Sequence, residues 1–153
     1  MEPNQHVFVS AFLCEKLLTD YGVSDEDKAL SAIRLADTFI FELPENQREA
    51  LLFSPVVNTH LVIIHKCEAA RQVITSIACL QPDGTPFEHA RSYAISLKGG
   101  GYGHILVTPI SVRPSQAGVY WIEIAVDGNL AQRVPIEVRF EPGQKTNSPN
   151  QTP

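Results

Sequence analysis

The sequence has little of what marks a protein that binds nucleic acid, membranes or metals. Its 153 residues hold 12 lysines and arginines against 17 acidic residues, a formal net charge of -5. Binding to nucleic acid or to an anionic membrane surface needs a basic excess, so we expect neither partner. The 3 cysteines are odd in number and form no C-x-x-C pair. We therefore expect buried thiols that pack as small apolar side chains, without disulfides.

Long apolar runs and a targeting signal are also missing. No stretch reaches the roughly 18 apolar residues of a membrane-spanning helix. Residues 1–6 lack the basic segment that opens a secretion signal, and no small-residue cleavage site follows them. These features predict a cytoplasmic protein. The hydrophobic fraction of 44% and the charged fraction of 19% are those of a globular domain.

What the sequence does contain is a series of segments rich in β-branched and aromatic residues, separated by turn residues. This pattern predicts an all-β fold, an immunoglobulin-like two-sheet antiparallel sandwich of about eight strands. The predicted strands cover residues 6–14, 30–41, 57–66, 72–80, 91–98, 104–112, 118–126 and 130–140.

Two inserts interrupt the strand pattern, and they predict one or two short helices, with an ordered loop as the alternative for residues 15–29. Residues 15–29 contain two leucines and an acidic run, and residues 44–53 begin with a proline that suits the first turn of a helix. We assign residues 1–142 to a single sandwich domain. Residues 143–153 are polar, contain two prolines, and predict a disordered tail.

The clearest strand prediction is the closing hairpin. Apart from Gln132, the even positions of 118–126 and 130–140 hold apolar residues or glycine, so each strand should bury one face. Asp127-Gly128 is a strong hairpin signal. A three-residue loop would set Val126 opposite Leu130, Ile122 opposite Val134 and Tyr120 opposite Ile136, and would join the two apolar faces. Glu123 then faces Arg133, and Pro135 predicts a sheet edge or a bulge.

A short stretch before the hairpin resembles the approach to the sixth strand of immunoglobulin-like domains. In Ser115–Trp121 a Gly-x-Tyr step leads to Tyr120, which the resemblance places at a tyrosine corner. Ile122 stands where antibody domains carry their second cysteine. The resemblance therefore implies a sandwich without the disulfide that joins the two sheets.

The whole chain also resembles a family of short, uncharacterised bacterial proteins that share a domain of unknown function. Three stretches carry this resemblance: Phe8–Glu15, Leu30–Asp37 and Gly118–Gly128. The resemblance implies a bacterial source and a sandwich fold. It implies no activity, cofactor or site residue.

Candidate chemistry is sparse. The 5 histidines form no H-E-x-x-H or H-x-H pattern, and His60 and His65 have opposite parity in one predicted strand. Because metal ligands must converge on one point, we expect neither a metal site nor a cofactor. Cys14 could pair with a histidine as a nucleophile, but nothing around it supplies a base or an oxyanion hole. Burial is the favoured interpretation of Cys14.

Four side chains are candidates for contact with a partner. Trp121 and Val119 face outward by parity, and Arg133 lies on the same outer face. Trp121 is either covered by an insert or exposed to a partner. Tyr102 lies in the glycine-rich segment 99–103, which is either a flexible connection or a loop that binds a ligand.

Asp37 shares parity with an apolar face, so we expect a buried acid that bonds to the backbone or to an arginine of another strand, with Arg71 and Arg91 as candidates. Whether Asp37 has a structural or a functional role stays open.

Three functional hypotheses follow. The favoured one is a non-enzymatic module that binds a protein partner, or itself, through a sheet face or edge. The first alternative is a domain that binds a small ligand through residues 99–103. The second alternative is an uncatalogued hydrolase, for which only Cys14 and the scattered histidines speak.

Overall fold

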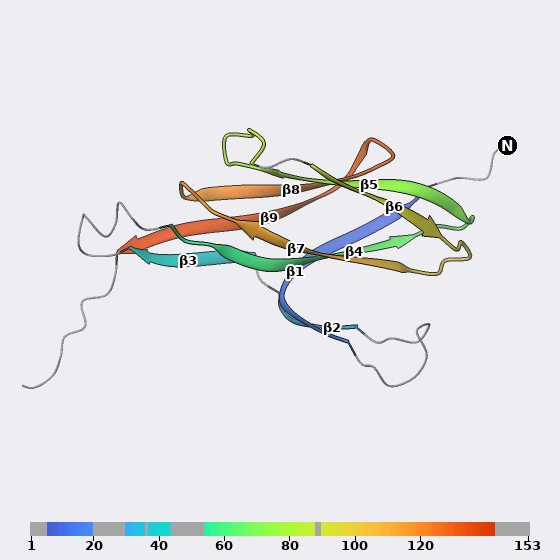
Figure 1. Cartoon of the computed structure of the whole chain (residues 1–153), viewed down its shortest axis with the longest axis horizontal. Coiled ribbons are helices and arrows are strands. Elements are labelled where there is room, and N and C mark those ends of the chain that lie inside the picture. The colour runs from blue at the N-terminus through green and yellow to red at the C-terminus, as the bar shows by residue number, and fades with distance from the viewer. Residues whose placement is uncertain (1–5, 20–29, 36, 44–53, 88–89, 143–153) are drawn as a thin grey trace, which may run out of the picture.

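The described part of the chain is built from β-strands. The computed structural model describes residues 6–19, 30–35, 37–43, 54–87 and 90–142, and these contain no helix. No helix long and apolar enough to cross a membrane occurs within these ranges. The strands (Figure 1) are β1 (Phe8–Thr19), β2 (Leu30–Leu35), β3 (Thr38–Leu43), β4 (Val57–Lys66), β5 (Arg71–Leu80), β6 (Arg91–Leu97), β7 (His104–Val112), β8 (Gly118–Val126) and β9 (Asn129–Pro142).

These strands form two sheets. One has the order β2-β1-β4-β7 and the other the order β3-β9-β8-β5-β6. The two sheets lie as layers, and the main core between them combines apolar side chains from both (Figure 1). The prediction of an all-β, two-sheet fold is therefore confirmed. The fully buried core side chains include Leu61, Ile63, Ile110, Tyr120, Ile122, Ile124 and Ile136.

The two predicted helical inserts have different outcomes. Residues 15–19 continue strand β1, so this part of the first prediction is wrong. Pairing explains the difference, because Lys16 to Thr19 lie opposite residues of β2 and extend the hairpin between these strands. Residues 20–29, the insert 44–53 and the predicted tail 143–153 lie outside the described residues.

Residues 30–41 were predicted as one strand and instead contribute to both sheets. β2 pairs with β1 and sets Leu35 opposite Cys14. β3 joins the other sheet and pairs with β9, with Phe39 opposite Val138. The chain keeps its direction as it changes sheet, and β9 runs the same way, so this pair is parallel. The prediction of a purely antiparallel sandwich is wrong for this pair, while the other strand pairings are antiparallel.

The closing hairpin confirms the predicted strand register but corrects the loop. Val126 pairs with Asn129, so the loop has two residues, with φ of 50° at Asp127 and 81° at Gly128. Two positive φ values are typical of a type I′ turn, which suits Asp-Gly. A register shift follows at Ile124 and Ala125, where the pairing passes over Ala131. This bulge restores the parity, so Ile122 lies opposite Val134, Tyr120 opposite Ile136 and Glu123 opposite Arg133, as predicted.

The hydroxyl of Tyr120 makes the contact expected of a tyrosine corner. It donates to the carbonyl oxygen of Gln116 over 3.1 Å and accepts from the backbone N–H of Gln116 over 3.4 Å. The ring is buried and meets Phe87 edge to face. These bonds fix the turn that leads into β8 against its own strand.

Candidate functional site

Trp121 lies on the outer face of the five-stranded sheet, as predicted, and is partly covered there. Its cross-strand neighbours are Leu80 on β5 and Pro135 on β9. The side chain is 37% exposed, and Val119 on the same face is half-buried. Trp121 therefore presents only part of its ring to a partner.

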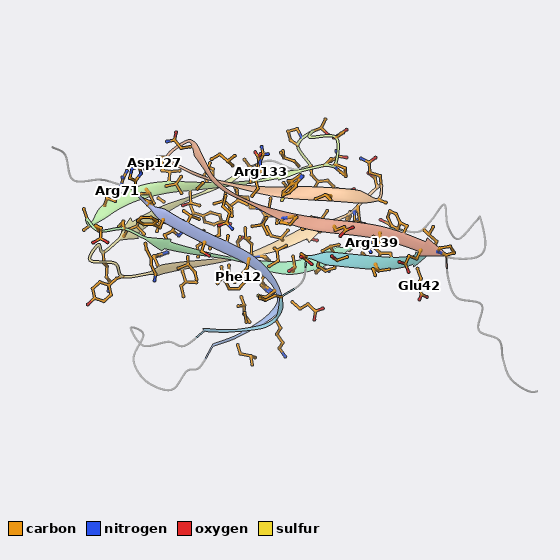
Figure 2. All side chains as sticks on the ribbon, turned by 180° about the vertical axis from the view of Figure 1, so that it is seen from behind. Phe12, Glu42, Arg71, Asp127, Arg133 and Arg139 are labelled. Atoms are coloured by element: carbon orange, nitrogen blue, oxygen red, sulfur yellow. The ribbon has the colours of Figure 1, made fainter. Side chains whose placement is uncertain are left out.

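Two ion pairs lie on the same outer face as Trp121. Arg133 contacts Glu123 through its Nη2 at 2.6 Å and its Nε at 2.9 Å. Arg139 contacts Glu137 at 2.8 Å further along β9 (Figure 2). The predicted contact residue Arg133 thus has its charge balanced within its own sheet. The charged side chains of this pair of strands are therefore paired within the sheet, while apolar side chains such as Ile74 (55% exposed) also lie on this outer face.

The glycine-rich segment 99–103 is held against the loop between β4 and β5. Gly100 donates its N–H to the carbonyl of Glu68, and Gly101 donates to the carbonyl of Cys67. A Cβ on Gly99 would lie 2.4 Å from the backbone nitrogen of Ala70. Because these N–H groups already have acceptors, they do not form an anion cradle.

Tyr102 follows this anchored loop and is 72% exposed. Its backbone N–H donates to Gly99, so the turn is closed beneath it. The next residue, Gly103, approaches the side chains of Ile64 and Lys66. Tyr102 therefore lies at one end of the outer face of the four-stranded sheet.

That outer face carries a contiguous apolar surface. The pairing sets Ser10, Ile64 and Ile105 in one row across β1, β4 and β7. Phe12, Val62 and Val107 form the next row. We call the accessible apolar residues here the outer-face patch: Phe8 (66% exposed), Tyr102 (72%), Ile105 (46%) and Val107 (37%), with the half-buried Phe12 and Ile64.

This face carries no described acidic residue. Among the described residues whose parity directs them outward from β4, β7 and the part of β1 paired with β4, none is aspartate or glutamate, while Lys66 is a lysine. A shallow hollow of about 250 Å³ lies between β1 and β4, lined by Phe8, Ile64 and Lys66 among others. The two outer faces of the sandwich are therefore chemically different.

Two histidines face each other at one end of the core. His65 on β4 lies opposite His104 on β7, with ring centroids 6.1 Å apart. His65 is fully buried, and its Nε2 is 2.9 Å from the hydroxyl oxygen of Thr75. Burial lowers the pKa of His65, and the nearby charge of His104 lowers it further. His65 is therefore a neutral, structural imidazole at pH 7.

Within the described ranges, no group of three or more histidine, cysteine, aspartate or glutamate side chains is arranged to hold a metal ion. His60 is half-buried on β4, and His89 lies outside the described residues.

Cys14 is buried, as are Cys67 and Cys79, and all three are free thiols. Burial raises the pKa of the Cys14 thiol. A nucleophilic cysteine needs the opposite shift, because the thiolate is the reactive form. Cys14 is therefore held as a packed side chain, and the hydrolase hypothesis loses its main candidate.

The expectation of a buried Asp37 is wrong. Asp37 is exposed, its carboxylate accepts a hydrogen bond from the Thr38 hydroxyl at 3.1 Å, and its backbone carbonyl accepts from the N–H of Glu137. The crossing between the two sheets explains this, because Asp37 lies between β2 and β3 and not within a strand. Arg71 contacts Asp127 instead, at 2.8 Å, and Arg91 donates to the carbonyl of Pro109.

Comparison with known proteins identifies no family. No family model matches the chain, and no curated protein matches it. Similar solved structures include an alkylpurine DNA glycosylase from Pseudomonas fluorescens (12% identity, TM-score 0.44, 87% of this chain and 30% of that one). A β-glucosidase from Listeria innocua shows 6% identity and a TM-score of 0.46 over 91% of this chain and 16% of that one.

A third similar structure is an immunoglobulin-like protein from Pseudomonas aeruginosa, with 10% identity and a TM-score of 0.34, over 90% of this chain and 100% of that one. The chain thus spans 30% and 16% of the lengths of the first two proteins. At these identities and scores, the comparisons assign no activity to the chain.

Proposed function

We propose that this chain is a non-enzymatic protein-interaction module with an immunoglobulin-like sandwich, and that it binds its partner through the outer-face patch. The observation that carries this proposal is the exposure of Phe8 and Ile105 on one sheet face, at 66% and 46%, and of Tyr102 in the loop before β7, at 72%. Contiguous apolar surface of this kind marks contact sites in soluble proteins. Aromatic residues are also the side chains most enriched in protein interfaces.

The strand arrangement supports the immunoglobulin-like part of the proposal. The neighbouring strands β1, β4 and β7 correspond in order to A, B and E of an immunoglobulin sandwich, and β5, β8 and β9 correspond to C, F and G. The hydroxyl of Tyr120 bonds back to Gln116 at the position of the tyrosine corner. A chain of this architecture offers two sheet faces for binding, and the two differ here.

The chemistry of the patch indicates the kind of partner surface. Lys66 lies on the same outer face, and no described outward residue of β4, β7 or the part of β1 paired with β4 is acidic. A partner that presents apolar side chains with carboxylates around them would complement this surface. On the outer face of the five-stranded sheet, by contrast, Arg133 and Arg139 pair with glutamates of the same sheet.

A pair of isoleucines provides a matched test. Ile105 belongs to the outer-face patch and is 46% exposed, while Ile74 is 55% exposed on the outer face of the other sheet. A photo-crosslinking residue at position 105 should form one discrete adduct in cells that express the chain. The same residue at position 74 should not. Ile105→Lys should abolish formation of the partner complex, and Ile74→Lys should leave it intact.

Light scattering of the purified protein separates a partner from self-association. A strict monomer that forms the adduct at position 105 indicates a different protein, whereas a dimer that Ile105→Lys dissolves indicates a second copy. Equal adducts at both positions, or none at position 105, would overturn the proposal.

A further inference from the structure

The edge of β1 is only half covered by its neighbouring strand. β2 pairs with β1 from Cys14 to Thr19. After Leu35 the chain crosses to the other sheet, where β3 pairs with residues 137–142 of β9. Within the described ranges, no strand lies beside Phe8–Leu13 on the side away from β4. This open strip is roughly 20 Å long, at about 3.3 Å for each residue.

A side chain takes the place of a neighbouring strand at the centre of this strip. The amide nitrogen of Gln132 on β9 donates to the backbone carbonyl of Ala11 over 3.2 Å. The Ala11 carbonyl therefore points away from β4. Because backbone groups alternate along a strand, those of Val9 and Leu13 point the same way. The Oε1 atom of Gln132 is buried and has no hydrogen-bond partner among the described residues. It can therefore accept a hydrogen bond between β1 and β9.

The facing edge of β9 carries features that prevent the addition of another strand, and the edge of β1 does not. Glu137 donates its N–H to Asp37 on this side, so Arg133 and Pro135 also direct their backbone groups here. Pro135 has no N–H to offer, and the bulge at Ala131 disturbs the strand further. The β1 strip from Phe8 to Leu13 contains no charge and no proline, which are the usual means of blunting an edge.

One hollow lies between residues 6–7 and the β8–β9 hairpin, and a second lies in the seam between β1 and β9. The first, of about 500 Å³, is lined by His6, Val7 and the ion-paired Arg71 and Asp127, among others. Arg71 and Asp127 lie beyond one end of the strip, and Phe12 lies near the other (Figure 2). The second hollow, of about 250 Å³, is lined by Leu13, Leu35, Val134 and Pro135 with Asp37 at one side. Alternate side chains of an added strand would point toward this seam.

We propose that the edge Phe8–Leu13 binds an extended, uncharged segment of a partner protein as an additional strand of the four-stranded sheet. The segment takes the position that β2 would have reached had it continued past Leu35. Its backbone pairs with Val9, Ala11 and Leu13, and the Gln132 amide yields the Ala11 carbonyl to it. One of its apolar side chains enters the hollow beside Leu13. This site differs from the outer-face patch, because it recognises a backbone and lies on the edge of the sheet.

Selection from a library of short random peptides supplies the probe. Peptides that bind the full chain should be uncharged at their centre and should shift the NMR signals of the Val9, Ala11 and Leu13 amides and of the Gln132 side chain. N-methylation at every second residue of the selected peptide removes the N–H groups that face β1. Methylation at the intervening residues leaves those groups in place. Each blocked N–H that faces β1 should weaken binding roughly tenfold, the equivalent of about 1.4 kcal/mol, and the intervening positions should have little effect.

Two variants separate this site from the rest of the molecule. Ala11→Pro removes an N–H that faces the open edge and makes no ladder bond to β4, so it should reduce binding while the dispersed NMR spectrum of the fold is kept. Ile105→Lys alters the outer-face patch and should leave peptide binding unchanged. Failure of the outer-face proposal can therefore be distinguished from failure of the β1-edge proposal.

The methylation series uses the unmodified protein and decides the question even if Ala11→Pro does not fold. No selected peptide, or equal sensitivity to methylation at both sets of positions, would overturn the proposal. Dimers formed through the same amides without peptide would overturn the choice of partner and replace it with a second copy of the chain.

Discussion

The imidazole of His65 and the hydroxyl of Thr75 form a hydrogen bond that joins the two sheets inside the core. The Nε2 and Oγ1 atoms are 2.9 Å apart, and both side chains are fully buried. His65 comes from β4 and Thr75 from β5, so this polar contact links the inner faces of the sandwich. The Nδ1 atoms of both His65 and His104 are buried without a partner among the described residues. A positive charge at this point would therefore be poorly compensated.

Acid should destabilise the fold through His65. Burial, and the charge of His104 after it, lower the pKa of His65 below its usual value of 6.5. The unfolded chain then binds the proton more readily, so the free energy of unfolding falls as the pH drops below 6.5. Urea titrations at several pH values should show this loss. In His65→Gln, which cannot take up the proton, the pH dependence below 6.5 should be shallower. Equal slopes for the two proteins would contradict the assignment.

The tyrosine corner predicts a loss of stability in Tyr120→Phe. This substitution removes the hydrogen bond to the Gln116 carbonyl and leaves the ring in place. We expect a decrease of about 0.5–1.5 kcal/mol in the free energy of unfolding, the usual net value of such a bond. Tyr102→Phe is the control, because the side chain of Tyr102 is 72% exposed and should give no measurable change. A Tyr120→Phe variant as stable as the parent would show that the corner bond contributes nothing.

The glycine-rich loop offers a matched pair of substitutions. Gly99 and Gly101 have φ of 76° and 74°, so alanine is strained to a similar degree at either position. They differ in space: a Cβ at Gly99 would lie 2.4 Å from the Ala70 backbone, whereas one at Gly101 meets nothing within 4 Å. Gly101→Ala should cost about 1 kcal/mol. Gly99→Ala should cost clearly more, because the loop between β4 and β5 must move. Thermal unfolding of both variants gives the comparison, and equal losses would show that the close approach is unimportant.

Much of the fold could be predicted from residue alternation, and the closing hairpin shows where this stops. Parity correctly set Ile122 opposite Val134 and Glu123 opposite Arg133. Parity could not decide whether the hairpin has a three-residue loop or a two-residue loop followed by a bulge. Both arrangements give the same register beyond Ala131. The loop has two residues because Asp127 and Gly128 both adopt positive φ, as a type I′ turn requires. This turn preference outweighs the simpler pairing that a three-residue loop would give.

The candidate surface was harder to predict than the fold. Residues 104–112 contain apolar side chains at both parities, so the sequence does not say that Ile105 and Val107 face outward while Leu106 and Ile110 face the core. Only the pairing with β4 decides it. In 118–126 one parity is cleanly apolar, which made the remaining Trp121 stand out. Sequence alternation therefore identified Trp121 on the outer face of the five-stranded sheet. It missed Ile105 and Val107 of the outer-face patch on the four-stranded sheet.

The turn residue Asp127 connects the hairpin to β5, and its substitutions should separate charge from hydrogen bonding. One carboxylate oxygen contacts Arg71 at 2.8 Å, and the other accepts the backbone N–H of Ile74 at 2.9 Å. Asparagine tolerates the φ of 50° and keeps an oxygen for Ile74, so Asp127→Asn loses chiefly the exposed ion pair. It should cost less than about 1 kcal/mol.

Asp127→Ala should cost more, about 2–3 kcal/mol. It removes the acceptor for Ile74 and also puts a residue poorly suited to positive φ at the first position of the turn. Urea unfolding at low and at high salt provides the measurement. Salt screens the ion pair with Arg71 but not the turn, so the deficit of Asp127→Asn should shrink at high salt and that of Asp127→Ala should largely persist. If both variants lost the same stability at every salt concentration, the ion pair, and not the turn geometry, would dominate the contribution of Asp127.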